Sequence, residues 1–459
     1  MTGRGRKWAG RRLLVLYRIL PGAARATVSD HVEAFRRYSG AKCVYVNLAR
    51  QKVPAWLQSA RFDGVILHTT LLSARWAPSV FWKLAAELSF LGAWDALKIA
   101  LPQDEFIHTE SLCEFLRAIG THHIFSVAPE SEWPTIYAGL DRSTVRIDRV
   151  LTGYLEPATL RRIERLAKRV SRRSIDIGYR AYGQRFSLGE HGQMKIKIAQ
   201  EVEKRIEHKR LTADISTRAE DTLLKDDWYR FLLECRYTIG VEGGASVHDP
   251  RGSIRAQTLQ YVSEHPEASF EDVRGICFPG EEGSMALYAL SPRHLEACAT
   301  RTCQLLVVGD FNGILEPDRH YIPLRRDLGD LDNVLNELDD EERRLEIVHR
   351  AHQDIVESGE YSYESFVRFV LDRAVEGRED LLSTSSRVAT GILVARARME
   401  EAVPRGLAKR LVRGMVSAGR WTLRMAPRPF RPSLRRAARA LLALLKQETH
   451  QQKRGRTKQ

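Results

Sequence analysis

Three ionisable side chains stand together behind a proline in the stretch ALYALSPRHLEA, residues 286–297. They are Arg293, His294 and Glu296, and the apolar run CQLLVV (303–308) follows closely. A proline is typical of the first turn of a helix, where free backbone N–H groups favour anions. Either these side chains cap and solubilise the helix, or they hold a ligand.

Two further cations, Arg180 and Lys195, lie in IGYRAYGQRFSLGEHGQMK (177–195), a glycine-containing loop that follows an expected strand. An arginine binds phosphate through its bidentate fork, and a lysine binds it as a point charge. The pair therefore suits a diphosphate. The alternative is that both cations are simply exposed to solvent.

Paired glycines, Gly243 and Gly244, occur in IGVEGGASVHDPRGS (239–253) after an apolar stretch. Glycine lets the backbone approach a ligand closely, and successive amides can cradle a phosphate. The pattern is neither GxGxxG nor a P-loop, because no GK[ST] follows. A tight turn explains it as well as a phosphate site does.

Candidates for a general base follow two expected strands. Asp104 and Glu105 end the segment LPQDEFIH (101–108), and His68 begins HTT (68–70). Side chains at the carboxyl ends of parallel strands face the ligand-binding edge of a sheet, where a carboxylate or imidazole can accept a proton. A helix N-cap explains Asp104 equally well, and a buried core histidine is the more common fate of a residue such as His68.

Another polar group is found in ILEPDRHYIPLRRD (314–327), where His320 and Tyr321 precede a short expected strand. Their planar rings could stack on a base or contact a sugar. Asp330 and Asp332 form a DxD pattern, but they precede a long helix and are interpreted as capping residues. We therefore expect no metal site there.

The six cysteines show no CxxC spacing. They indicate reduced, buried thiols, a cytoplasmic protein and no zinc site. No G-x-S-x-G motif indicates a serine hydrolase.

The elements that must position these residues alternate between strand and helix. Expected strands lie at 13–20, 43–48, 64–70, 97–103, 123–128, 173–183, 238–246 and 303–309, separated by segments with helical periodicity. This order predicts an α/β protein built from two Rossmann-like, doubly wound domains that face each other across a cleft. We expect the first domain at 1–155, the second at 156–385 and a tail at 386–459.

Charge is distributed unevenly along the 459 residues. The net charge is +14, yet 18 Lys and Arg and only three acids lie between Arg396 and the C-terminus, so the body is nearly neutral. The stretch SLRRAARALLALLKQ (433–447) predicts a basic amphipathic helix that binds anionic membrane surfaces. A helix docked on its own protein is the alternative. Because the basicity is confined to this tail, we expect no specific nucleic-acid binding.

The stretches IGYRAYG, FLLECRYTIGVEGGAS, SPRHLEACATRTCQLLV and HYIPLRRD together resemble bacterial glycosyltransferases of the GT-B fold. The likeness is greatest to the family 1 and family 4-like, spore-maturation-type proteins of surface-polysaccharide biosynthesis. It covers about residues 13–375 and is most specific in 228–366.

This resemblance implies that the second domain binds a nucleotide-sugar donor and the first domain binds the acceptor. It places Arg180, Lys195 and Arg293 on the donor phosphates and Glu296 on the ribose, as the second glutamate of the family's EX7E pair. The remaining expected donor contacts are Gly243, Gly244, His320 and Tyr321. The first glutamate of the pair is replaced by Tyr288.

The resulting prediction is a metal-independent, cofactor-free glycosyltransferase that acts on a polysaccharide, lipid-linked or other cell-surface glycan acceptor. Arginine, lysine and a helix N-terminus can stabilise the leaving diphosphate in place of a metal. We expect it in the cytoplasm, peripherally bound to the inner membrane face. The alternative is a non-catalytic protein of the same fold that binds a nucleotide sugar or a partner.

Overall fold

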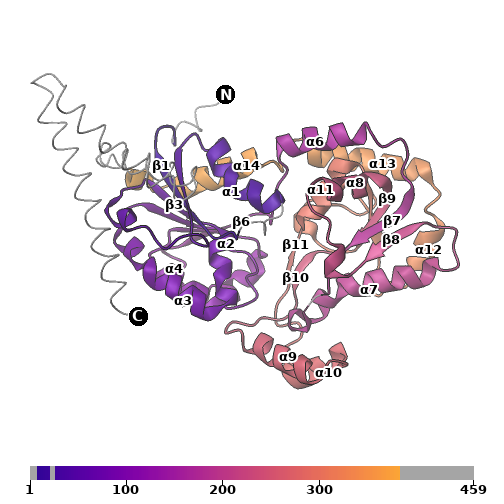
Figure 1. Ribbon diagram of the computed structural model, residues 1–459, viewed down its shortest axis with the longest axis horizontal. Coiled ribbons are helices and arrows are strands. Elements are labelled where there is room, and N and C mark those ends of the chain that lie inside the picture. Colours follow the sequence, from indigo (N-terminus) through magenta and orange to yellow (C-terminus); the bar gives the residue numbers. More distant parts are fainter. Residues whose placement is uncertain (1–7, 21–25, 184, 383–459) are drawn as a thin grey trace, which may run out of the picture.

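Two parallel sheets form the body of the protein in a computed structural model, which describes residues 8–20, 26–183 and 185–382 (Figure 1). The first sheet has the order β2-β1-β3-β4-β5-β6 and the second has the order β13-β12-β9-β7-β8. All neighbouring strands in both sheets run parallel. The prediction of two doubly wound α/β domains is therefore confirmed.

The strands of the first sheet are β1 (Arg12–Tyr17), β2 (Lys42–Asn47), β3 (Gly64–Leu67), β4 (Leu97–Ala100), β5 (His123–Ser126) and β6 (Arg146–Arg149). Those of the second sheet are β7 (Ile175–Arg180), β8 (Ala213–Ser216), β9 (Cys235–Gly240), β12 (Cys303–Val307) and β13 (Ile322–Leu324). A separate antiparallel pair, β10 (Gly243–Ala245) and β11 (Leu287–Ala289), lies beside the second sheet.

Helices cover both faces of each sheet, as parallel strands require. Those of the first half of the chain are α1 (Ala26–Tyr38), α2 (Thr69–Leu72), α3 (Pro78–Glu87), α4 (Thr109–Ala118), α5 (Trp133–Ile136) and α6 (Pro157–Ala167). Those of the second half are α7 (Gly189–Ile206), α8 (Asp226–Glu234), α9 (Ser253–Glu264), α10 (Phe270–Cys277), α11 (Pro292–Thr300), α12 (Leu331–Asn336), α13 (Glu341–His352) and α14 (Tyr363–Val375).

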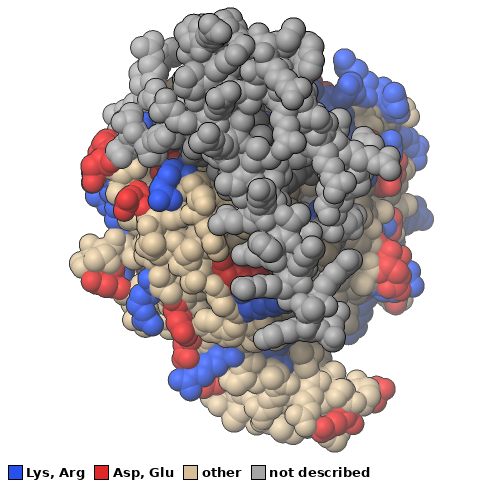
Figure 2. All heavy atoms as spheres, turned by 60° about the vertical axis from the view of Figure 1, so that its left-hand side comes forward, with Lys and Arg blue, Asp and Glu red and all other residues tan. Residues whose placement is uncertain are grey.

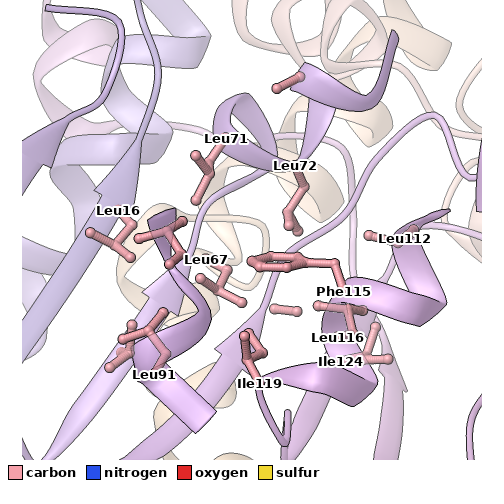
Figure 3. Close-up of a cluster of buried hydrophobic side chains, with 14 of the residues drawn as sticks. Leu16, Leu67, Leu71, Leu72, Leu91, Leu112, Phe115, Leu116, Ile119 and Ile124 are labelled. Carbon is pink, nitrogen blue, oxygen red and sulfur yellow. The ribbon is translucent and has the colours of Figure 1, made fainter. Parts of the chain in front are cut away.

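Alternating residues of β1 serve two cores in the first domain. Leu14 and Leu16 join a cluster with α2, α3, α4 and α5, part of which Figure 3 shows around Leu67 and Phe115. Leu13 and Val15 join a second cluster with α1 and α14 on the opposite face. Because both faces are buried, β1 reads as a continuous apolar run rather than an alternating one.

The last described helix returns to the first domain. Residues of α14 belong to the same buried cluster as β1 and α1, and the indole of Trp8 donates to the carbonyl of Leu371 at 3.3 Å. The chain crosses back beside the outgoing segment, where the Leu155 amide donates to Tyr361 at 2.8 Å and the Tyr363 amide donates to Leu155 at 3.0 Å. Residues from 363 onward, which the sequence assigned to the second domain, thus pack with the first.

After Arg149, the last residue of β6, the chain crosses between the domains and enters α6 at Pro157. The expected tail, 386–459, lies outside the described residues. Among the residues that are described, no helix is long and apolar enough to cross a membrane. The same residues contain no group of three or more His, Cys, Asp or Glu side chains suited to a metal ion.

The packing of the second domain makes a prediction at Gly178 in β7. A Cβ atom there would lie 2.1 Å from the sulfur of Cys235 and 2.8 Å from the ring of Phe231. Gly178→Ala should therefore lower the free energy of unfolding by about 1–3 kcal/mol, as measured by urea denaturation. Gly183→Ala, whose added methyl meets nothing within 4 Å, serves as the control. Equal stability of the two variants would contradict this account of the packing.

Candidate functional site

A pocket lies where the carboxyl ends of the strands of the two domains meet. Its volume is about 240 Å³, and it is lined by Asp104 and Phe106 from the loop after β4 and by residues of β7, β9, α7 and α11 from the second domain. We call it the central pocket. A neighbouring side pocket of about 100 Å³ is lined by Thr27 of α1 together with Trp228 and Glu296.

The central pocket brings together the three cations that the sequence analysis expected to bind phosphates. Arg180, Lys195 and Arg293 all line it, and the only acidic side chain among its described lining residues is Asp104. Positive charges in a recess between low-dielectric walls concentrate the electrostatic potential. The pocket therefore suits an anion with more than one negative charge.

Aromatic side chains and hydrogen bonds hold two of these cations in place. The Arg180 guanidinium lies 4.4 Å from the ring centroid of Phe231 and 2.7 Å from a carboxylate oxygen of Asp214. The Arg293 guanidinium lies over Trp228 and donates to the carbonyl of Arg180. Stacking of this kind fixes the plane of a guanidinium, and in Arg180 the Asp214 carboxylate offsets part of the positive charge.

The three ionisable residues of α11, which are Arg293, His294 and Glu296, lie in different environments. Arg293 faces the central pocket, and Glu296 lines the side pocket and accepts from the Trp228 indole at 2.8 Å. His294 is buried against Gln304, with its Nδ1 at 2.9 Å from the amide oxygen, and burial lowers the pKa of His294 to about 4. His294 also lines the central pocket, and Arg293 lines both pockets. The hydrogen bond to Gln304 holds the neutral imidazole of His294 against the base of the central pocket.

Trp228 is a site residue to which the sequence analysis assigned no role. It contacts both Arg293 and Glu296 and lines both pockets. Trp228 lies in α8, far from α11 in sequence, and only packing of α8 against α11 brings the residues together. No local spacing in the sequence signals this contact.

The glycine pair has a structural role and one member reaches the pocket. Gly244 adopts a positive φ of 126°, and a Cβ atom there would lie 1.8 Å from the carbonyl oxygen of Leu287 on β11. Only glycine fits this close approach. Gly244 lines the central pocket, whereas Gly243 is paired with Ala289 and does not.

Of the three base candidates, only Asp104 is exposed at the pocket. Glu105 is fully buried and accepts hydrogen bonds from the Ser126 hydroxyl, the Val127 amide and the Tyr137 hydroxyl. Burial raises the pKa of Glu105 above its usual value. The expectation that Glu105 faces the cleft is corrected: its carboxylate ties the β4 loop to the end of β5.

His68 is likewise buried and serves as the N-cap of α2. Its Nδ1 accepts from the Thr70 amide at 3.1 Å, so its Nε2 carries the proton and donates to His31 Nδ1 at 2.8 Å. Burial holds the pKa of His68 well below its ordinary value, and the neighbouring His31 lowers it further. His68 lines neither pocket, and a structural role replaces the expected role as a base.

His320 and Tyr321 are also placed away from both pockets. His320 Nδ1 accepts from the Glu316 amide at 3.0 Å, and its Nε2 lies 3.1 Å from Asp354. Tyr321 is fully buried in an apolar cluster with Phe311. The expected stacking on a base or sugar is therefore corrected, because the loop before β13 folds onto the core.

Tyr288, which stands where the family pattern has a glutamate, packs against an aromatic partner. Its ring stacks on His191 with centroids 3.9 Å apart, and the Arg326 guanidinium lies 5.7 Å from its centroid. Burial, together with the cations Arg326 and Lys195, lowers the pKa of His191 to about 4. A neutral aromatic pair thus occupies the place of a carboxylate.

No family model and no curated protein matches the chain. Among solved structures, Anabaena HepE in complex with UDP-glucose is 10% identical over 80% of this chain and 100% of its own, with a TM-score of 0.43. AviGT4, a glycosyltransferase involved in avilamycin A biosynthesis, is 10% identical over 82% and 99%, with a TM-score of 0.41. Sucrose-phosphate synthase from Thermosynechococcus elongatus is 10% identical over 80% and 98%, with a TM-score of 0.43. The two-domain fold is established by the strand pairing of the two parallel sheets.

The His31–His68 pair predicts a pH-dependent stability. Burial holds the pKa of His31 at about 4 in the folded protein, below its ordinary 6.5. The unfolded chain therefore binds more protons between these values, and stability is lost as the pH falls from 6.5 toward 4. His31→Gln should flatten the plot of unfolding free energy against pH by about 1 kcal/mol per pH unit.

Urea denaturation at a series of pH values measures this slope. The exposed His208→Gln is the control and should retain the wild-type slope. An unchanged slope in His31→Gln would show that the buried pair does not stay neutral in the folded protein.

Proposed function

We propose that this protein is a glycosyltransferase that moves a sugar from a nucleotide-sugar donor to a hydroxyl group of a glycan or lipid-linked acceptor. The observation that carries the proposal is the composition of the central pocket. Three cations from the second domain and one carboxylate from the first domain meet there. This is the charge arrangement needed to hold a diphosphate beside a base.

Cleavage of a sugar–diphosphate bond places negative charge on the leaving phosphate. Arg293, Lys195 and Arg180 stabilise that charge, with help from the N-terminus of α11, whose cap Ser291 also lines the pocket. The charge that a divalent ion could supply is thus available from side chains. We accordingly propose that activity does not need a metal.

Asp104 acts as the general base in this mechanism. Its carboxylate accepts the proton of the acceptor hydroxyl while the hydroxyl oxygen forms a bond to the anomeric carbon, and the bond to the diphosphate breaks. A base from the domain opposite the donor suits a single displacement at that carbon. Glu296, held by Trp228 at the edge of the site, is placed to accept hydrogen bonds from the ribose.

A second candidate function rests on the stacked pair of Tyr288 and His191. In place of a carboxylate, which could accept hydrogen bonds from a sugar, this position offers an aromatic face. A protein that binds a nucleotide sugar without transferring it, or that binds a partner, is compatible with that substitution.

Nucleotide binding gives the first test of the site. Arg293→Ala and Lys195→Ala should each weaken UDP binding about 10- to 100-fold in isothermal titration calorimetry, because each removes a charge-assisted contact to phosphate. Arg218→Ala, which removes an exposed cation elsewhere in the second domain, should leave the affinity unchanged. Equal losses in all three variants would indicate nonspecific charge attraction instead of a site.

Turnover separates the enzyme from the non-catalytic binder. We expect wild-type protein, with EDTA present, to release nucleoside diphosphate from at least one member of a panel of UDP-, GDP- and ADP-sugars as the sugar passes to water or to the hydroxyl of an added acceptor. Asp104→Asn should lower that rate by about 10²- to 10⁴-fold while UDP affinity is retained. Glu114→Gln on the exposed face of α4 is the matched control. Tight binding of nucleotide without release from any donor would favour the second candidate function.

The basic segment after residue 385 adds a location to the proposal. Its excess of arginine and lysine favours attraction to anionic lipid headgroups. Full-length protein should float with vesicles containing phosphatidylglycerol, and protein truncated at residue 395 should not. Equal flotation of the two forms, or no flotation of either, would contradict the proposed membrane binding of this segment.

A further inference from the structure

A helical hairpin inserted in the second domain is joined to the first domain by backbone hydrogen bonds. Helices α9 and α10 form this insertion between β10 and β11, and Figures 1 and 2 show it projecting as a lobe from the rest of the molecule. At its base, residues 248–252 lie along residues 106–110 of the first domain. We call this contact the clasp.

Three backbone hydrogen bonds cross the domain boundary in the clasp. The His108 amide donates to Asp249 at 2.9 Å, the Asp249 amide donates to Phe106 at 2.8 Å, and the Glu110 amide donates to Pro250 at 3.2 Å. Ile107 and Asp249 form a parallel β-bridge. Domain interfaces within a chain are commonly polar surfaces that permit relative motion, whereas backbone pairing fixes the register of the two segments.

Side chains reinforce the same contact. The Thr109 hydroxyl lies 2.9 Å from His248 Nε2, and Arg251 donates to the Glu110 carboxylate at 2.9 Å. Gly252 has a positive φ of 78°, and a Cβ atom there would lie 2.0 Å from the His108 ring. The close approach of the two segments therefore depends on glycine at position 252.

The first-domain half of the clasp continues into the loop that presents Asp104. Both Asp104 and His108 adopt left-handed backbone conformations, with φ of 54° and 51°. Non-glycine residues seldom hold that conformation unless their surroundings impose it. Arg75, which is fully buried, holds both ends of this loop by donating to the carbonyls of Leu72, Gln103, Asp104 and Ile107.

We propose that the clasp and Arg75 are positioning elements that set the carboxylate of Asp104 against the donor pocket. Arg75 fixes the loop from within the first domain, and residues 248–252 fix it from the second. The donor-binding domain thereby places the base supplied by the acceptor domain, so the reacting groups come into register only when the domains are joined. The inference rests on the proposed function of Asp104 as the base.

Hydrogen exchange tests the clasp without any assay of activity. In wild-type protein the amides of His108, Glu110 and Asp249 should exchange slowly, because each is bonded across the boundary. Gly252→Ala should speed their exchange by about tenfold or more. Gly275→Ala in α10, whose methyl meets nothing within 4 Å, is the matched control and should not. Thr109→Val, which removes the bond to His248, provides a second variant with the same expected direction.

Turnover tests the positioning role. With a donor that wild-type protein cleaves, Gly252→Ala should lower kcat about 100-fold through misplacement of the base, and UDP affinity should stay within about twofold. In the Asp104→Asn background, adding Gly252→Ala should cost at most about threefold more, because the two changes act through one group.

The possible failures are distinguishable. Rapid exchange of the three amides in wild-type protein, or unaltered exchange in Gly252→Ala and Thr109→Val, overturns the clasp. Full additivity of Gly252→Ala with Asp104→Asn overturns the positioning role but leaves the proposed function standing. Absence of turnover by wild-type protein with every donor overturns both.

Discussion

The buried guanidinium of Arg75 holds the backbone in place where the two domains meet. Arg75 has no exposed surface, and four backbone carbonyls accept its hydrogen bonds. Burial lowers the pKa of Arg75, and the nearby carboxylates of Asp104 and Glu105 counteract that effect. An unsatisfied charge at this depth would be costly, so the loop after β4 must keep its carbonyls turned inward. The outward direction of Asp104 and the pairing of residues 106–110 with the second domain follow from that constraint.

The electrostatics of the central pocket follow from how the second sheet ends. Arg180 lies at the carboxyl end of β7, Lys195 lies in the second turn of α7, and Arg293 lies in the first turn of α11. Parallel strands bring such positions to one edge of the sheet. The rings of Phe231 and Trp228 in α8 stack against the guanidinium groups of Arg180 and Arg293, respectively. The cations gather because of topology, and aromatic packing holds them in orientation.

Much of the fold could be predicted from the sequence, because buried parallel strands are short apolar runs bounded by helical periodicity. Most observed strands lie within or beside the expected ranges. Helix α14 lies in the range expected for the second domain but packs with the first. Nothing in its apolar face indicates which of the two sheets it covers. Its partner is set by the crossing at Leu155 and Tyr363, a contact between residues far apart in the sequence.

The candidate site could be predicted only in part. Because Asp104 and Arg180 lie at or just after the ends of strands, the sequence predicted that they lie at the edge of the sheet, and both line the central pocket. The same reasoning chose His68 and Glu105, but both side chains are buried in the first domain. The difference arises from left-handed backbone at Asp104 and from the hydrogen bonds to Ser126 and Tyr137, neither of which has a local sequence signal. The clasp was not anticipated, because it joins segments that are adjacent only in the folded chain.

The central claim is that the cations of the second domain hold a diphosphate opposite Asp104. The most direct measurement is a crystal structure of the full chain with bound UDP. The account predicts that the two phosphates contact Arg293 and Lys195 in the central pocket, with Trp228 and Glu296 toward the ribose. A nucleotide bound elsewhere would contradict it, for example in the larger groove lined by Arg149 and Arg368 beside α14.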